Sequence, residues 1–189
     1  MRRRDFIGCA AGLSLLPCQG LSAQPERKTK KQVPKPTGKG TGPLKFTHAV
    51  VDIAIVCSHF QESLRFYHEQ LGLEIAQDLR IPDAVATGAA LAPRGFRHVR
   101  LRAGNTLIKL MDIASPPPRR SDQFAAGVRW LTFFVEDVRQ TFDQLKAKGV
   151  KFLSDPVAAP DAAGVVCAVD PDGVLIEFVQ VHGTKQKSE

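Results

Sequence analysis

The sequence predicts an α+β fold of two paired βαβββ modules, and two observations support this prediction. Residues 51–72 and 129–149 each read as a strand, a capped helix and a glycine that ends the helix. The hairpin strand Thr106–Met111 aligns with Val174–Val179. Repeated units of this kind pack against each other and bury a continuous core. We therefore expect an open, cup-shaped mixed sheet with helices on its outer face and a ligand cleft between the modules.

Residues 1–23 have the parts of an export signal. A basic start with Arg3 and Arg4 precedes a short apolar run at 8–16, and small residues suited to cleavage follow. The start resembles the twin-arginine type of signal, which implies export of a folded protein to the bacterial periplasm. The run is too short to cross a bilayer, so no stable membrane anchor is expected. A lipid on Cys18 is the weaker alternative, because a proline precedes this cysteine.

Residues 24–45 are predicted to be a disordered tether, because almost no residue there could join a core. Residues 1–45 hold 10 Lys and Arg against 2 Asp and Glu, which leaves 16 against 17 in the rest of the chain. The basic pI of 9.5 thus comes from the leader and tether. A nearly neutral folded part argues against nucleic acid as a partner. The predicted domain is 46–182, followed by a tail at 183–189.

Each module should contain a strand, a helix and three further strands. In the first module (46–113) the expected elements are a strand at 46–57, a helix at 60–71 and strands at 73–79, 97–102 and 106–113. In the second module (128–181) they are a strand at 128–135, a helix at 138–148 and strands at 150–153, 164–169 and 174–181. Loops are expected at 80–96 and 154–163, a link at 114–127, and turns at 103–105 and 170–173.

Both helices have start and stop signals. Ser58 and Asp137 each precede a helix and are followed three residues later by glutamine, which resembles a capping box. Gly72 and Gly149 come after the last apolar residues of the two helices, where a left-handed C-terminal cap is expected.

Alternate residues of a strand face opposite sides of a sheet, so the repeat assigns strand residues to faces. One face is apolar and should carry the helices; it holds Ile53, Ile55, Cys57, Ile108, Leu110, Leu131, Phe133, Val135, Ile176 and Phe178. The other face is mixed, as in a small-molecule pocket or a half-exposed sheet; it holds Asp52, Ala54, Val56, Lys109, Met111, Trp130, Thr132, Phe134, Leu175, Glu177 and Val179. Parity leaves open which face receives His98, Arg100 and Arg102.

Five segments carry a family resemblance: Val51–Ser58, Leu64–Leu73, Phe134–Val138, Leu145–Val150 and Asp170–Phe178. In these segments the sequence resembles the vicinal oxygen chelate superfamily, which includes glyoxalase I, extradiol dioxygenases and bleomycin-resistance proteins. The resemblance spans about Phe46 to Val181 and implies the paired-module fold. It does not specify a reaction, because lyases, isomerases, oxygenases and binding proteins share this fold.

In metal-dependent members of that superfamily, four strand positions aim His, Gln or Glu ligands into the cleft. Here these positions correspond to Asp52, Lys109, Trp130 and Glu177. Only Glu177 matches, and Asp52 is a usable oxygen ligand. A divalent metal normally takes three or more protein ligands, and the Lys109 ammonium would repel it. The resemblance therefore implies a degenerate metal site with at most Asp52 and Glu177, and we expect no cofactor.

The same positions suggest a charge trio in which Lys109 lies between Asp52 and Glu177, where the metal would be. Such a trio could perform chemistry, with Glu177 as proton acceptor and Lys109 stabilising an oxyanion. It could equally be a buried ion pair that only keeps the site folded.

Four more residues of the strands are candidates for substrate binding. Trp130 could stack on a planar substrate, and Phe134 and Met111 would add apolar lining. Arg100 with a neighbouring basic residue could bind a carboxylate or phosphate. Ordinary packing and a solvated strand face explain these residues equally well.

Two cysteines, Cys57 and Cys167, fall in strands of the predicted domain. Export makes a disulfide between them chemically possible. Two free thiols that pack as small hydrophobic side chains are the simpler expectation.

The sequence thus predicts an exported glyoxalase-like protein, monomer or homodimer, that binds a small organic molecule in its cleft. One hypothesis is a lyase or isomerase acting next to a carbonyl, similar to lactoylglutathione lyase. The alternative is a non-catalytic protein that sequesters a planar ligand, as bleomycin-resistance relatives do. A desolvated Glu177 open to the cleft would favour chemistry, whereas a Glu177 covered and locked to Lys109 would favour binding or structure.

Overall fold

The computed structural model describes residues 51–120 and 126–183. The predicted signal peptide, the tether, the first residues of the first strand and most of the tail lie outside the described residues. The rest of the first predicted module and the whole of the second fall within the described part. No helix of that part is long and apolar enough to span a membrane.

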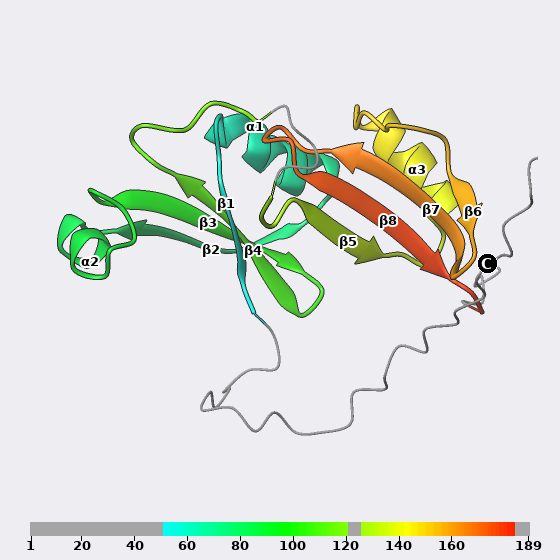
Figure 1. Cartoon of the computed structure of the whole chain (residues 1–189), viewed down its shortest axis with the longest axis horizontal. Coiled ribbons are helices and arrows are strands. Elements are labelled where there is room, and N and C mark those ends of the chain that lie inside the picture. Colours follow the sequence, from blue (N-terminus) through cyan, green and yellow to red (C-terminus); the bar gives the residue numbers. More distant parts are fainter. Residues whose placement is uncertain (1–50, 121–125, 184–189) are drawn as a thin grey trace, which may run out of the picture. The chain divides into compact units, whose positions relative to one another are not determined.

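The first module forms a four-stranded mixed sheet with the strand order β1-β4-β3-β2 (Figure 1). Its elements are β1 (Ile53–Val56), α1 (Phe60–Leu64), η1 (Arg65–Gln70), β2 (Glu74–Ile81), α2 (Asp83–Gly88), β3 (Phe96–Ala103) and β4 (Thr106–Asp112). Strand β1 runs parallel to β4, and the other neighbours are antiparallel.

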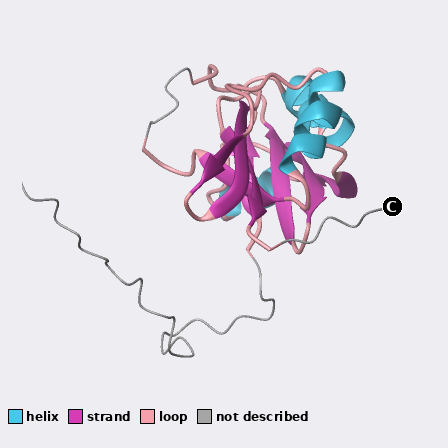
Figure 2. Ribbon diagram, turned by 90° about the vertical axis from the view of Figure 1, so that its right-hand side faces the viewer, coloured by secondary structure: helices cyan, strands magenta, loops and turns pink. Residues whose placement is uncertain are grey.

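The second module repeats this arrangement with the strand order β5-β8-β7-β6. Its elements are β5 (Trp130–Phe134), α3 (Val138–Ala147), β6 (Val157–Ala159), β7 (Ala162–Val169) and β8 (Leu175–Val181). Strand β5 is parallel to β8, as β1 is to β4. The predicted fold class is confirmed: two βαβββ-like modules, each an open four-stranded mixed sheet, with helix packed along one side of the strands (Figure 2).

Two short elements differ from the prediction. Helix α2 lies in the predicted loop 80–96, at the far end of β2 and β3 (Figure 1). Its sequence has no apolar period, and its one buried residue is Ala86. Strand β6 lies in the predicted loop 154–163, whereas the predicted strand 150–153 contributes only one isolated bridge, at Phe152.

Three of the four predicted helix caps are confirmed. Asp137 accepts a hydrogen bond from the backbone nitrogen of Gln140, at 2.9 Å, and so caps α3 as predicted. Gly72 and Gly149 have φ angles of 76° and 85°, which confirms the left-handed helix ends. The predicted cap at Ser58 is wrong, because its hydroxyl donates instead to a carboxylate of the second module.

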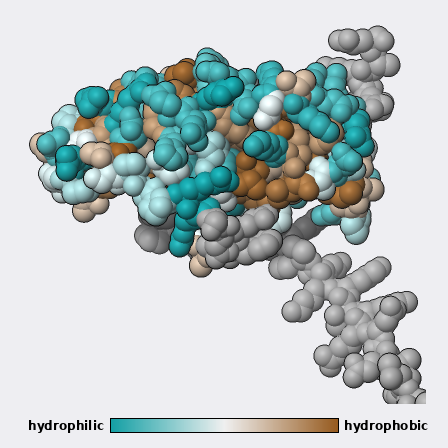
Figure 3. Space-filling model, turned by 90° about the horizontal axis from the view of Figure 1, so that it is seen from above, coloured by the Kyte–Doolittle hydropathy of each residue, from teal (hydrophilic) through white to brown (hydrophobic). Residues whose placement is uncertain are grey.

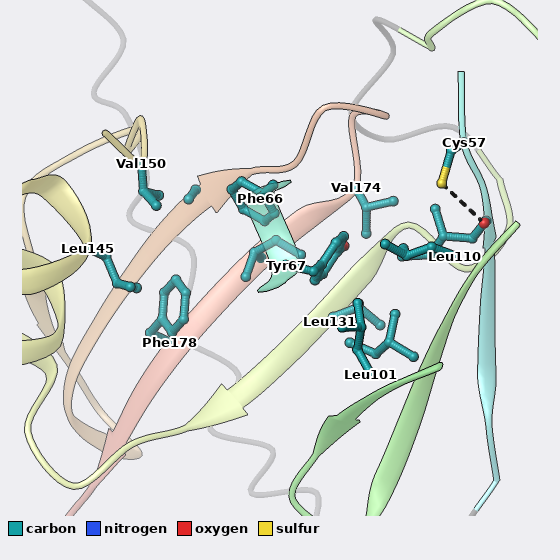
Figure 4. Close-up of a cluster of buried hydrophobic side chains, with 14 of the residues drawn as sticks. Cys57, Phe66, Tyr67, Leu101, Leu110, Leu131, Leu145, Val150, Val174 and Phe178 are labelled. Atoms are coloured by element: carbon teal, nitrogen blue, oxygen red, sulfur yellow. Dashed lines mark hydrogen bonds between the residues drawn. The ribbon is translucent and has the colours of Figure 1, made fainter. Parts of the chain in front are cut away.

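The helix of the first module becomes π-helical over η1, where the backbone nitrogen of Leu71 donates to the carbonyl of Phe66. Both Phe66 and Tyr67 are buried there. In Figure 4 these two side chains lie between Leu110 of the first sheet and Phe178 of the second. The core therefore continues from one module into the other. The residues of the predicted apolar face are buried or half-buried in this core, so that prediction is confirmed.

A buried polar network also joins the modules at the turn 170–173. Asp172 Oδ1 accepts bonds from the backbone nitrogen and the hydroxyl of Ser58, at 2.6 and 2.7 Å, and Oδ2 accepts one from Ser63 Oγ at 2.6 Å. Asp170 Oδ2 accepts the Tyr67 hydroxyl at 2.7 Å. The sequence predicted the turn but not this network.

Candidate functional site

The strand register resolves the question that parity left open. Arg100 lies directly opposite Lys109, and Lys109 lies opposite Ala54. Residues opposite each other on neighbouring strands share a face. Arg100 and His98, which is two residues away on β3, therefore lie on the mixed face of the first sheet.

Asp52, Lys109 and Arg100 form one cluster on this face. The Nζ atom of Lys109 is 3.1 Å from Asp52 Oδ2, and the Nε atom of Arg100 is 3.8 Å from the same oxygen. The side chains of Asp52 and Lys109 are each 26% exposed. Arg100 also donates through Nη1 to Gln77, at 2.9 Å. The cluster carries two positive charges and one negative charge, so it favours a ligand with an acceptor or a negative charge.

His98 is a buried residue of the same face, opposite Met111 in the register. Its Nε2 atom is buried and has no hydrogen-bond partner among the described residues. Burial lowers the pKa of His98, and the cations of Arg100 and Lys109 lower it further. His98 is therefore neutral near pH 7 and offers a polar ring beside the charged cluster.

Glu177 is the centre of a second cluster, on the mixed face of the second sheet. Its Oε2 atom accepts hydrogen bonds from the indole nitrogen of Trp130, at 3.0 Å, and from the hydroxyl of Thr132, at 2.7 Å. Thr132 was on the predicted face but was not among the predicted site residues. Its direct pairing with Glu177 across β5 and β8 follows from the repeat and could have identified it.

The face around Glu177 is apolar and open. Trp130 is 51% exposed and Phe134 is 73% exposed. Phe134 lies opposite Val179 in the register. In the view from above, apolar surface gathers over the half of the domain that holds the second module (Figure 3). Exposed aromatic rings beside a fixed carboxylate suit a planar organic ligand.

The predicted trio of Asp52, Lys109 and Glu177 is not formed. Lys109 pairs with Asp52 on the first sheet, while Glu177 bonds to Trp130 and Thr132 on the second. No ion pair joins Lys109 to Glu177 within the described part of the chain. Parity specified the face of each residue within its own module, but it carried no information on how the two modules sit against each other.

The donor set does not fit a divalent metal. Among residues 51–120 and 126–183, no three His, Cys, Asp or Glu side chains are grouped so as to hold an ion. Asp52 already has a cation as its neighbour, and Glu177 is on the other sheet. A metal site normally has three or more protein ligands, which Asp52 and Glu177 cannot supply.

The two cysteines of the described part are free thiols. Burial raises the pKa of Cys57 to about 12, with the Asp172 carboxylate adding to the shift. Cys167 lies opposite Glu177. Burial is the main cause that raises the pKa of Cys167, and the Glu177 carboxylate raises it further. Raised values keep both groups as unreactive thiols at neutral pH.

Comparison with known sequences identifies relatives over most of the domain. The family profile named Glyoxalase/Bleomycin resistance protein/Dioxygenase superfamily matches residues 46–178. The uncharacterized protein YwkD of Bacillus subtilis is 28% identical over 131 residues, which cover 68% of this chain and 93% of YwkD. YraH of the same organism is 29% identical over 133 residues, which cover 70% of this chain and 98% of YraH.

Solved structures share the fold. A glyoxalase family protein from Bacillus cereus has a TM-score of 0.62 at 17% identity, with 76% of this chain and all of that chain covered. TnmS3, an antibiotic binding protein from Streptomyces sp. CB03234, has a TM-score of 0.52 at 21% identity, with 73% and 98% covered. Together with the profile match and the two paired modules, these likenesses show that the chain belongs to the glyoxalase/bleomycin resistance protein/dioxygenase superfamily.

Proposed function

We propose that this protein binds a planar organic molecule that carries a hydrogen-bond donor or a positive charge. The observation that carries the proposal is the Glu177 cluster, in which Trp130 and Thr132 both donate to Oε2. The other oxygen, Oε1, has no partner among the described residues and can accept a bond from a ligand. The Trp130 and Phe134 rings beside it would cover the flat body of that ligand.

The geometry favours binding because the acceptor is already held in place. Two hydrogen bonds fix the Glu177 carboxylate before any ligand arrives, so less side-chain freedom is lost on binding. The exposed rings gain contact area when a flat molecule covers them. The antibiotic-binding relative TnmS3 offers a precedent for ligand binding on this fold.

A lyase or isomerase remains the alternative from the sequence, but it needs Lys109 and Glu177 to act on one substrate. Within the described chain Lys109 is paired with Asp52 and forms no ion pair with Glu177. The Asp52 carboxylate beside Lys109 offsets the positive charge that would stabilise an oxyanion, which weighs against this role. We therefore favour binding without chemistry, and without a divalent metal.

We further propose that the protein acts in the periplasm, as the signal-like sequence at 1–23 predicts. Replacement of Arg3 and Arg4 by lysine should keep the protein in the cytoplasmic fraction of the producing bacterium. Unchanged recovery from the periplasmic fraction would contradict the twin-arginine route.

The binding test uses Trp130 as its reporter, because it is the chain's single tryptophan. Titration with proflavine, a planar cation with amino donors, should quench its fluorescence to saturation. Glu177→Gln should weaken that affinity about tenfold, since a charge-assisted bond becomes a neutral one. The matched control Glu62→Gln changes an exposed glutamate of helix α1 and should have no effect. A chelator such as EDTA should also leave the affinity unchanged.

Three outcomes would contradict the proposal. The first is a tryptophan fluorescence that proflavine leaves unchanged, and the second is a loss of affinity in Glu62→Gln as large as that in Glu177→Gln. The third outcome is turnover of the methylglyoxal–glutathione hemithioacetal that disappears in Glu177→Gln, because that result would assign a lyase activity to the same carboxylate.

A further inference from the structure

A cavity of about 490 Å³ lies where the link between the modules passes β1. Three segments wall it: the end of β1, the link residues 117–120 and 126–129, and the turn at Asp172–Val174. None of the predicted site residues lines it. Its volume lies in the range of small-molecule sites.

Three arginines line this cavity: Arg119 and Arg120 of the link, and Arg129 just before β5. Among the described residues, none of them has a carboxylate within ion-pair distance. The one carboxylate in the lining, Asp172, is already bonded to Ser58 and to a second serine. Within the described part of the chain, the positive charge that lines this cavity is therefore not paired with a carboxylate, and it would attract anions.

The guanidinium of Arg129 is held in place by the turn. Its Nη2 atom donates to the carbonyl of Gly173 at 2.8 Å, which holds the guanidinium in place. Its Nε atom is buried and has no partner among the described residues. The other N–H groups of a guanidinium held in this way can donate to an anionic oxygen in the cavity, and such charge-assisted bonds are strong.

The rest of the lining is largely apolar. Pro117 and Pro118 come from the link, and Val56 and Val128 are exposed valines of the two modules. Val128 is 73% exposed, so a ligand could cover much of its side chain. An apolar wall beside guanidinium groups matches an anion that carries an apolar body.

Close packing at Gly173 holds the wall of the cavity. A Cβ atom at this position would collide with the carbonyl oxygen of Arg120 and approach Arg129 Nη2 to 3.1 Å. The link backbone can therefore lie against the turn only because this residue has no side chain. This contact keeps the arginines of the link beside β1 and the turn.

We propose that this cavity is a second ligand site, for a small organic anion such as a carboxylate, sulfonate or phosphate ester with an apolar body. Arg129 is the fixed donor, and Arg119 and Arg120 supply the remaining charge. The site is separate from the Trp130 and Glu177 face, so it does not depend on the function proposed above. This site would prefer a negatively charged ligand, whereas the Glu177 cluster would prefer a hydrogen-bond donor or a positive charge.

The test measures the affinity of 2-naphthalenesulfonate by calorimetry, with 2-naphthalenemethanol and inorganic sulfate as comparison probes. The sulfonate should bind at least about tenfold more tightly than either comparison probe, because it has both the charge and the apolar body. Equal binding of sulfate would overturn the apolar part of the proposal, and equal binding of the neutral alcohol would overturn the anion part.

Variants then locate the site. Arg129→Gln should weaken sulfonate binding at least about tenfold. The double variant Arg119→Gln with Arg120→Gln should also weaken it, and because both residues are exposed it tests the site even where Arg129→Gln fails to fold. Arg80→Gln removes one exposed charge elsewhere and should leave the affinity unchanged. Loss of sulfonate binding in Glu177→Gln, with normal binding in the double variant, would overturn the proposal by placing the anion on the other face.

Discussion

The carboxylates at the module junction and those on the sheet faces have opposite surroundings. Asp170 and Asp172 are buried, and both oxygens of each accept hydrogen bonds from within the chain. Asp52 is partly exposed and faces two cations. Glu177 is half-buried and has one oxygen without a partner in the described part of the chain.

This difference separates polar groups that hold the fold from polar groups that can meet a ligand. A buried group that already makes all its hydrogen bonds cannot form another with a substrate. Its removal leaves the groups bonded to it buried without a hydrogen-bond partner. A half-exposed group with unused bonding capacity contributes little to stability and can exchange water for a ligand. Substitutions at the junction should therefore destabilise the protein more than substitutions on the sheet faces.

Asp172→Ala should give the largest loss. It removes the acceptor of the Ser58 and Ser63 donors, which stay buried, so the free energy of unfolding should fall by roughly 3–5 kcal/mol. Asp52→Ala is the matched control and should cost less than about 1 kcal/mol, because its ion pair is partly exposed. Urea unfolding measures both. Equal losses would show that the two kinds of carboxylate do not differ.

Asp170 should make the stability depend on pH. Burial raises the pKa of Asp170 to about 6, although the bonds from Tyr67 and the Val174 nitrogen oppose the shift. The folded protein then binds the proton more tightly than the unfolded chain does. The resulting stability is complete below about pH 4 and is lost as the pH rises through about 6, on the order of 3 kcal/mol in all.

Asp170→Asn removes this titration while keeping a side-chain oxygen that can accept hydrogen bonds. Urea unfolding of both proteins at pH 4, 5.5 and 7 gives the test, since other groups titrate equally in the two. The wild type should lose more stability than the variant between pH 4 and pH 7. Parallel curves would contradict a raised pKa at Asp170.

Tyr67→Phe should cost about 1–2 kcal/mol, because it removes one donor from the buried Asp170 and keeps the ring in the core. The bond from Tyr67 lowers the pKa of Asp170, so its loss should also move the pH-dependent window to higher pH. Ser115→Ala deletes an exposed hydroxyl and serves as the control, with almost no effect expected. An unmoved window would mean that Tyr67 does not interact with the ionised carboxylate.

Much of the fold could be predicted because the repeat constrains each module internally. The apolar face, the turn at 170–173 and the cap at Asp137 follow from spacing within one module. The bonds from Ser58 and Ser63 to Asp172 could not be predicted, since they join residues 114 and 109 positions apart in different modules. Helix α2 was missed because its short sequence has no apolar period.

The candidate site could likewise be predicted within each module. The predicted convergence across the two modules was wrong for the same reason. Trp130 and Glu177 were assigned to one face of the second module, and the structure joins them by a hydrogen bond. Asp52 and Lys109 were likewise assigned to one face of the first, and they form an ion pair. The convergence of Lys109 with Glu177 depended on the placement of one module against the other, which strand parity cannot give.

The smallest effect concerns Lys109. Its ion pair with Asp52 is partly exposed, so Lys109→Met should lower the free energy of unfolding by less than about 1 kcal/mol, not by the larger amount that a buried trio would lose. A double-mutant cycle with Glu177→Gln should give a coupling below about 0.5 kcal/mol, because no ion pair or hydrogen bond joins the two residues in the described part of the chain. The same cycle with Asp52→Asn is the positive control, since that pair is 3.1 Å apart. A clear coupling between Lys109 and Glu177 that grows with protein concentration would contradict this expectation and show that a second copy of the chain brings the two residues together.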